Sequence, residues 1–351
     1  MTVSALNKLR GSDATRWPNI AAAESLSRDK MIALTQIVGD LLPTDEGSLV
    51  VFGSLARGEF TVDSDLDWTI LIDGRADSRH LEIVHTLKPR LEAAGFKVPG
   101  PTEVFGGLVF SHELVHAIGG DDDTNKNMTR RLLLLLESAA IDAPGSIEVH
   151  GRITTGILNR YVEEDANFIA SNRRNDKIPR FLLNDVVRFW RTMAVDYANK
   201  YRARAGDKWA LRNIKLRMSR KLLFVSGFFM CISWALNQQA SAGESFIVQK
   251  LVSHLRHWTE QSPIESLATV VGRHASHLTA DVFDAYDEFL LLLNDEQKRK
   301  LLEQLTPEQA YENPVFLEAR NIANKFDGAL TKLIFESDEQ VTQLVKRYGV
   351  F

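Results

Sequence analysis

The sequence has few of the features that would assign it at once to a class of protein. Its 351 residues include a single cysteine, Cys231, so no disulfide framework can form within the chain. The net charge is −4, which gives no overall basic excess that would indicate binding to nucleic acid. Residues 1–17 lack the apolar core of a signal peptide. Together with the single cysteine, this leads us to expect a cytoplasmic protein.

Long hydrophobic runs are also scarce. The longest, "LLFVSGFFMCISWAL" at Leu222–Leu236, has 15 residues and is interrupted by Ser226, Gly227 and Ser233. A membrane span needs about 20 apolar residues. We therefore expect a buried core helix here and no membrane insertion.

The patterning of the chain predicts an α+β fold. Residues 1–20 carry little periodicity and are expected to be weakly ordered. The runs "GSLVVFGS", "LDWTILIDG" and "TEVFGGLVF" predict strands, and "SRHLEIVHTLKPRLEAAGF" predicts a helix with Ser78 as its N-cap and Gly95 as its stop. Later segments are helical, beginning with "TNKNMTRRLLLLLES", which Thr124 or Asn125 would cap. We expect a helical segment at 1–46, a small mixed-sheet core at 47–145 and a mostly helical domain at 146–351.

The segment "VVFGSLARGEFTVDSDLDWTILIDG" carries the strongest chemical signal. Gly53 and Ser54 stand where a strand enters a turn, so backbone N–H groups and a small hydroxyl can meet phosphates there. Asp65 and Asp67 follow on either side of Leu66, and alternation along a strand places such a pair on one face. Two carboxylates on one face can hold Mg²⁺ or Mn²⁺. Each element alone is common, but their combination at this spacing is specific.

This segment resembles the signature of the DNA polymerase β-like nucleotidyltransferase superfamily, Gly-Ser followed by Ser-Asp-x-Asp. Its "ARGE" piece is similar to the uridylyltransferases that modify PII signalling proteins, and to bacterial synthases of oligonucleotide signals used in antiphage defence. The resemblance covers about residues 47–140. It implies that Gly53 and Ser54 bind phosphate and that Asp65 and Asp67 bind the catalytic metal.

The resemblance assigns further candidates. Arg57 matches a basic position beside the triphosphate, and Ser64 matches the small residue before the first carboxylate. Many superfamily members place a third carboxylate on a later strand. Glu103, and less well Glu113, is the candidate here, although neither lies in a convincing strand pattern.

Basic residues outside the motif supply the remaining nucleotide-binding candidates. In the PII-modifying enzymes a helix in a similar place carries an arginine that faces the site. Arg130 or Arg131 matches it, and Arg131 is our candidate. Lys200–Lys221 holds nine basic residues against one acid. Lys208 and Lys215 fall on one face of that stretch, which is either a solvated surface or a positive wall for a triphosphate or oligonucleotide.

A competing pattern, H-E-x-x-H-x-x-G-x-x-D, occupies His112–Asp122. On a helix His112 and His116 would share one face and could bind zinc, with Glu113 as general base, as in a metalloprotease. Ser111 offers the alternative of an N-cap, with polar residues in a first helical turn where they are favoured anyway. We favour the structural helix.

We therefore expect a metal-dependent nucleotidyltransferase that moves an NMP or dNMP from an NTP or dNTP to a hydroxyl acceptor with release of pyrophosphate. A nucleotide or short oligonucleotide acceptor, giving a template-independent signal in phage defence, is our first expectation. A protein side chain as acceptor, a non-catalytic nucleotide sensor and a zinc protease are the alternatives. The sequence leaves the oligomeric state open.

Overall fold

The computed structural model describes residues 4–11, 13, 15–42, 46–98, 104–142, 148–164, 177–203, 208–237 and 248–349. The chain divides into two compact units. We call Glu24–Asn172 with Ser245–Ser262 the sheet unit, and Met1–Ala23 with Arg173–Glu244 and Pro263–Phe351 the helical unit. Each unit is built from separate segments of the chain, whereas the sequence pattern predicts continuous domains.

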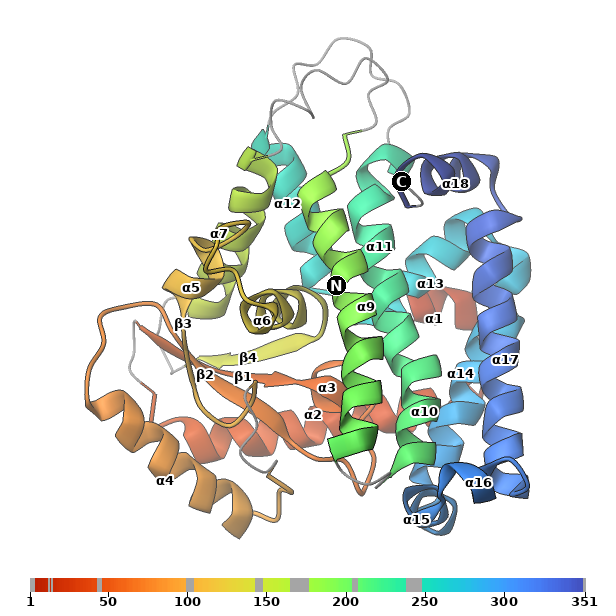
Figure 1. The fold of residues 1–351 in the computed structure, drawn as a ribbon, viewed down its shortest axis with the longest axis horizontal. Helices are drawn as coiled ribbons and strands as arrows, with labels where there is room; N and C mark the ends of the chain where they lie inside the picture. Colours follow the sequence, from red (N-terminus) through yellow and green to blue (C-terminus); the bar gives the residue numbers. More distant parts are fainter. Residues whose placement is uncertain are drawn as a thin grey trace. The chain divides into compact units, whose positions relative to one another are not determined.

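A four-stranded sheet organises the sheet unit (Figure 1). Its strands are β1 (Gly47–Phe52), β2 (Asp67–Ile72), β3 (Leu108–Phe110) and β4 (Ser138–Asp142), in the order β3-β2-β1-β4. Strand β1 is antiparallel to both β2 and β4, while β2 and β3 are parallel. The predicted mixed sheet is confirmed, but β4 was not predicted, and β3 is much shorter than "TEVFGGLVF".

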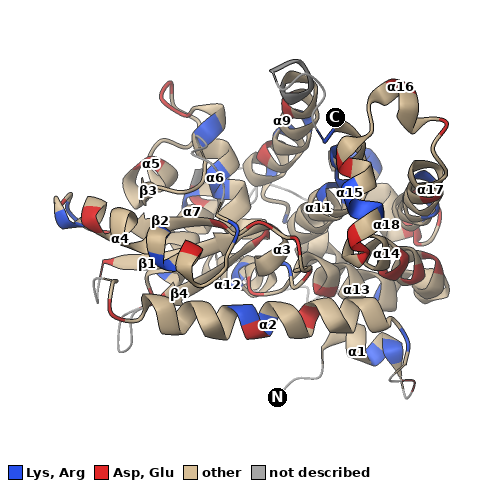
Figure 2. Cartoon of the chain, turned by 90° about the horizontal axis from the view of Figure 1, so that it is seen from below, with Lys and Arg blue, Asp and Glu red and all other residues tan. Residues whose placement is uncertain are grey.

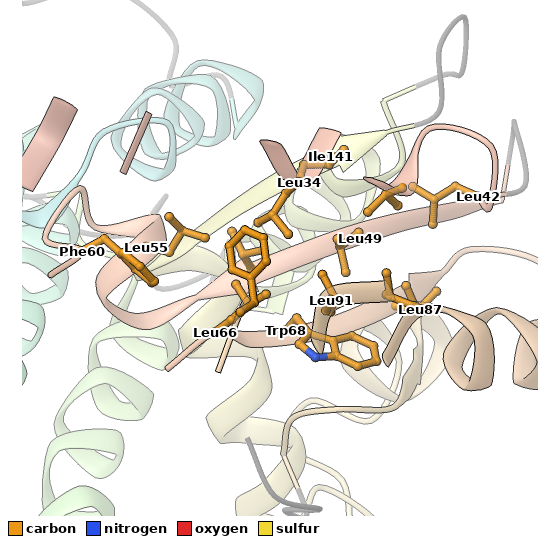
Figure 3. Close-up of a cluster of buried hydrophobic side chains, with 14 of the residues drawn as sticks. Leu34, Leu42, Leu49, Leu55, Phe60, Leu66, Trp68, Leu87, Leu91 and Ile141 are labelled. Atoms are coloured by element: carbon orange, nitrogen blue, oxygen red, sulfur yellow. The ribbon is translucent and has the colours of Figure 1, made fainter. Parts of the chain in front are cut away.

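One face of the sheet packs on α2 (Pro18–Val38) and α4 (Arg79–Ala93). Apolar residues of β1 and β2 alternate toward this face, and their side chains are fully buried with those of the two helices (Figure 3). The labelled members are Leu34, Leu42, Leu49, Leu55, Phe60, Leu66, Trp68, Leu87, Leu91 and Ile141. Full burial of one such side chain contributes about 1.5–3 kcal/mol. This core fixes β1 and β2, and with them the turn between the strands.

The opposite face of the sheet is covered by α6 (Asn125–Leu136). Phe52, Thr69 and Leu71 line a small cavity together with Leu133 and Leu134 of this helix. The helix begins as predicted, because the Thr124 hydroxyl accepts a hydrogen bond from the N–H of Asn127 at 3.1 Å. Helices α5 (Ser111–Val115), α7 (Val149–Glu164) and α12 (Val248–Thr259) complete the unit, with α7 packed against both of the others.

Two predicted helix caps differ from the structure. Ser78 lies at the N-cap position of α4, but its side chain makes no capping bond. Instead the carboxylate of Asp77 accepts from the N–H of Arg79 at 2.9 Å. Ser111 is the first residue of α5 rather than its N-cap, and its hydroxyl donates to Asp73 at 2.7 Å. Gly95, with φ +78°, follows the end of α4 as predicted.

The helical unit confirms the predicted helical character of the C-terminal region. Its elements are α1 (Ala5–Arg10), α9 (Arg180–Ala203), α10 (Trp209–Arg217), α11 (Ser219–Asn237), α13 (Pro263–His274), η1 (Ser276–Leu278), α14 (Thr279–Asn294), α15 (Glu296–Gln304), α16 (Pro307–Ala310), α17 (Pro314–Phe335), α18 (Glu339–Leu344) and η2 (Val345–Gly349).

The expectation of weak order for residues 1–20 was wrong for the part of this segment that the structure describes, residues 4–11, 13 and 15–20. Ser4 caps α1, and its hydroxyl also donates to Glu265 of α13 at 2.6 Å. Trp17 is buried, and its indole N–H donates to Asp284 of α14 at 2.7 Å. Short polar segments of low periodicity are ordered here because carboxylates from distant helices bind them.

Among the described residues, one helical run, Trp209–Asn237, has the length and composition of a membrane span. However, 78% of its most apolar window is buried inside the protein. Cys231, Phe229 and Ile232 of α11 are all fully or almost fully buried. The predicted core helix is confirmed.

Candidate active site

The turn that follows β1 is shaped by a glycine. The chain passes from Phe52 directly into the short helix α3 (Gly53–Ala56), and Gly53 has φ +66°. A Cβ atom at this position would lie 3.1 Å from Oδ2 of Asp67. L side chains rarely adopt this φ, and the carboxylate leaves little room. Glycine thus allows the backbone of the turn to lie against Asp67.

The two carboxylates of the motif lie at the start of β2. Asp67 is the first residue of the strand, is half-buried, and pairs with Phe52 of β1. Asp65 is exposed and precedes the strand, so only one member of the pair lies in it. Between them Leu66 is fully buried, and its N–H donates to the carbonyl of Lys97 at 2.8 Å. The buried leucine anchors both neighbours at the edge of the core.

The loop before Asp65 is held by polar contacts. The hydroxyl of Ser64 accepts from the N–H of Thr61 at 3.0 Å and lies 2.9 Å from the Thr61 hydroxyl. Asp63 forms an ion pair with Lys97. Ser64 therefore closes the turn that presents Asp65, a role that its position in the motif did not reveal.

Arg57 follows α3 and is buried, with only 6% of its side chain exposed. Its Nε donates to Glu59 at 2.8 Å, and its Nη1 donates to Glu137. The predicted role beside a triphosphate remains a prediction. The sequence analysis missed both partners. Glu59 is the last residue of the "ARGE" piece, but Glu137 carries no sequence signal because it lies 80 residues from Arg57.

No third carboxylate stands beside Asp67 in the described part of the sheet. The parallel register pairs Ile70 with Leu108, and the chain before Leu108 continues alongside β2, since the N–H of Gly106 donates to the carbonyl of Trp68 at 2.7 Å. On the other side of Asp67, the row continues through Phe52 to Ser138. When the β2–β3 register is continued, Phe105 lies on one side of Asp67, and Phe52 and Ser138 lie on the other, so none of these neighbours is a carboxylate. Glu103 lies outside the described residues, and Glu113 is exposed on α5.

A comparison with known families identifies the type of domain that contains this turn and these carboxylates. The family model described as "Nucleotidyltransferase domain" matches residues 32–97, which include the Gly53 turn and both carboxylates. Residues 32–97 form a nucleotidyltransferase domain. Domains of this family are generally catalytic, which confirms the prediction of an enzyme. No curated protein and no solved structure gives a significant match to the chain.

The nucleotidyltransferase domain offers a donor set that suits a divalent cation. Asp65 and Asp67 supply hard carboxylate oxygens, and the space beside Oδ2 of Asp67 is one that a Cβ at Gly53 would fill. Mg²⁺ commonly takes one or two carboxylates and completes its octahedron with waters and substrate phosphates. The residues present therefore fit a Mg²⁺ or Mn²⁺ ion, which Asp65 and Asp67 would hold.

The two arginines of α6 have different surroundings. Arg131 is fully buried, and its guanidinium donates to both carboxylate oxygens of Asp123 at 2.7 Å and to the Tyr161 hydroxyl at 3.1 Å. Arg130 lines the small cavity on the α6 face of the sheet with Phe52 and others. Burial lowers the pKa of Arg130, and the charge of nearby Glu113 partly opposes this effect. Whether Arg131 contacts the nucleotide remains a prediction, but its described hydrogen bonds are internal.

The residues of the histidine pattern do not form a zinc site among the described residues. The rings of His112 and His116 have centroids 5.0 Å apart, and both side chains are exposed. However, α5 has only five residues, and no group of three or more potential metal ligands exists in the described part of the chain. The zinc-protease alternative therefore has no third ligand to support it there.

Lys208 and Lys215 belong to the helical unit. Lys208 precedes α10 with φ +55°, and its ammonium lies 3.5 Å from a carboxylate oxygen of Glu303 on α15. Helix α15 carries both signs of charge (Figure 2). Lys215 lies in the last turn of α10 and is half-buried. Their participation in nucleotide binding remains a prediction.

Proposed function

We propose that this nucleotidyltransferase joins an NMP from an NTP to the hydroxyl of a nucleotide or short oligonucleotide, releases pyrophosphate, and so makes a nucleotide signal without a template. The nucleotidyltransferase domain itself implies the transfer of an NMP from an NTP. The observation that supports the site is the close approach of the Gly53 turn to Asp67, where a Cβ would lie 3.1 Å from Oδ2. In this proposal the backbone of the turn binds phosphate and Asp67 binds the metal.

Each residue of the site has a defined task in this reaction. The first N–H groups of α3 have no intrahelical acceptor and can bind phosphate oxygens, with the half-buried Ser54 hydroxyl beside them. Asp65 and Asp67 would hold Mg²⁺ or Mn²⁺, which when bound neutralises phosphoryl charge and favours ionisation of the attacking hydroxyl. Leu66 and Ser64 keep the two carboxylates in place. The domain therefore works mainly by positioning and charge stabilisation.

Two features of the sequence support the small acceptor. The "ARGE" motif resembles that of bacterial synthases of antiphage signals, and Lys200–Lys221 is strongly basic within an acidic chain. A basic segment attracts the phosphates of a nucleotide acceptor. A cytoplasmic role in phage defence is part of this proposal. The second candidate is nucleotidylation of a protein side chain, which the likeness of the same motif to PII-modifying enzymes favours.

The test is to incubate the protein with each labelled NTP or dNTP and Mg²⁺ or Mn²⁺, then to measure pyrophosphate and separate the products. A labelled small molecule or ladder supports the proposal, whereas label on a protein band selects the second candidate. A wild-type protein that releases no pyrophosphate with either metal would overturn both.

Variants test the site itself. Asp65→Asn/Asp67→Asn should abolish pyrophosphate release without unfolding the domain, because Asp65 is exposed and Asp67 is half-buried. Asp40→Asn is the matched control, because Asp40 pairs with Arg90 between α2 and α4 on the opposite face of the sheet. Full activity of the double variant would show that the metal site lies elsewhere.

A further inference from the structure

The buried cluster of Arg57, Glu59 and Glu137 lies directly behind the phosphate-binding turn. Arg57 is the C-cap residue that follows α3, and its N–H donates to the carbonyl of Gly53 at 3.0 Å. The N–H of Glu59 donates to the carbonyl of Ser54 at 2.7 Å. Both ends of the Arg57–Glu59 ion pair are therefore also hydrogen-bonded to the backbone of the turn.

The third member ties this turn to the sheet. Glu137 immediately precedes Ser138, the first residue of β4. Ser138 pairs with Phe52, and Phe52 pairs with Asp67 on β2. Phe52 is also the residue before Gly53, where the turn begins. The Arg57–Glu137 ion pair therefore connects the end of the turn to the strand residues beside its start. The loop thus closed contains the phosphate-binding backbone and borders on the metal-binding carboxylate.

The chemistry of the cluster favours a fixed geometry. A guanidinium is planar, keeps its charge and presents several donors in a rigid fork, which suits two carboxylates from different segments. The three side chains are almost completely buried, with relative exposures of 6% for Arg57, 4% for Glu59 and 1% for Glu137. In such surroundings charge-assisted hydrogen bonds are strong and expensive to break.

We propose that Arg57 is a positioning residue, which sets the distance between the Gly53–Ser54 turn and Asp67 and makes no contact with the triphosphate. This inference rests on the proposed function, because it concerns the same site. It assigns Arg57 a role different from the one that the motif resemblance implied, and it adds Glu59 and Glu137 to the residues on which the reaction depends.

The two roles of Arg57 predict opposite effects of Glu137→Gln. If Arg57 bound phosphate, Glu137 would compete with the nucleotide, and its removal would lower the KM for NTP. If Arg57 positions the turn, Glu137→Gln weakens the link and lowers kcat/KM. The expected loss is on the order of 10- to 100-fold, since a misplacement of about 1 Å can cost about 100-fold.

The substitution Arg57→Lys provides a second test that distinguishes a positioning role of Arg57 from a phosphate-binding role. Lysine is a good phosphate ligand but lacks the planar fork. A positioning role therefore predicts that Arg57→Lys loses kcat/KM as Glu137→Gln does, while a phosphate-binding role predicts that it retains the wild-type KM.

The experiment measures pyrophosphate release and, independently, NTP affinity by calorimetry, for wild type, Glu137→Gln, Arg57→Lys and a control. The control is Arg90→Lys, because Arg90 donates to Asp40 at 2.6 Å and joins α4 to the end of α2 on the opposite face of the sheet. Circular dichroism and thermal melts identify the variants that fold. Loss in both cluster variants with a normal control supports the proposal.

Tighter NTP binding by Glu137→Gln, or wild-type kinetics of either folded cluster variant, would overturn the proposal that Arg57 is a positioning residue. An inactive wild type would instead overturn the proposed function, so the two failures are distinguishable. If neither cluster variant yields folded protein, Glu59→Gln serves as the third variant, with the same expected loss of kcat/KM and the same contrary outcome.

Discussion

Replacing Gly53 by alanine tests the geometry of the site most directly. The position has φ +66°, and left-handed backbone costs an L residue about 1–2 kcal/mol. The new Cβ would lie 3.1 Å from Oδ2 of Asp67, closer than ordinary van der Waals contact, so the carboxylate must shift by a few tenths of an ångström. The variant should therefore lose about 1–2 kcal/mol of unfolding free energy, and its metal site should be displaced as well.

Gly95 provides a control that distinguishes the effect of backbone strain from the effect of displacing the Asp67 carboxylate. Gly95 has φ +78°, and no atom lies within 4 Å of the place that a Cβ would take there, so Gly95→Ala introduces the same backbone strain without a neighbour. Urea unfolding should show similar losses of stability for both variants. Only Gly53→Ala should weaken Mn²⁺ binding and lower kcat/KM for pyrophosphate release, by about 10-fold or more.

Two results would refute this reasoning. One is a Gly53→Ala variant with wild-type kcat/KM and metal affinity, which would show that the turn and Asp67 do not act together. The other is an equal loss of activity in Gly95→Ala, which would attribute the effect to strain alone.

Three further predictions concern the stability and reactivity of the chain. Burial lowers the pKa of His150 from 6.5 to about 4, with a contribution from Arg256, so the unfolded chain binds a proton more readily between these pH values. Unfolding free energy should fall by up to about 3 kcal/mol as the pH drops from about 6.5 to about 4, and urea titrations should show a smaller fall in His150→Gln. Asp123→Asn should cost about 3–5 kcal/mol in the same assay, because it breaks a buried ion pair with Arg131; a loss below about 1 kcal/mol would contradict this. Burial raises the pKa of the Cys231 thiol, so a thiol reagent should label it only in denaturant, and rapid labelling of native protein would show that α11 opens.

The sequence predicted those parts of the fold whose cause is local. The apolar runs of β1 and β2, the helix α4 and the Thr124 cap of α6 depend on neighbouring residues, and each is found in the structure. Strand β4 was missed because "SAAID" has little β-propensity of its own. It is a strand because it pairs with β1, about 90 residues earlier in the chain.

The candidate site shows the same division between local and distant causes. Spacing alone predicted the glycine turn and the two carboxylates, since these depend on one short segment. The surroundings of Arg57 could not be predicted, because the motif alone does not show whether its basic residue binds phosphate or forms an ion pair with a distant residue such as Glu137. The left-handed backbone of Gly53 could not be predicted either, although its place in the motif indicated that a side chain would hinder the close approach of phosphate.

The junction between α6 and β4 has a consequence for how the chain can vary in length. The helix ends at Leu136 and the strand begins at Ser138, so Glu137 alone connects them. Inserting or deleting one residue there would exchange the two faces of β4 relative to β1 and would remove Glu137 from its place. Related chains that keep this site should therefore tolerate insertions in the loops around α4 and α5, but none at this junction, and the length of the helix–strand connection becomes a criterion for recognising them.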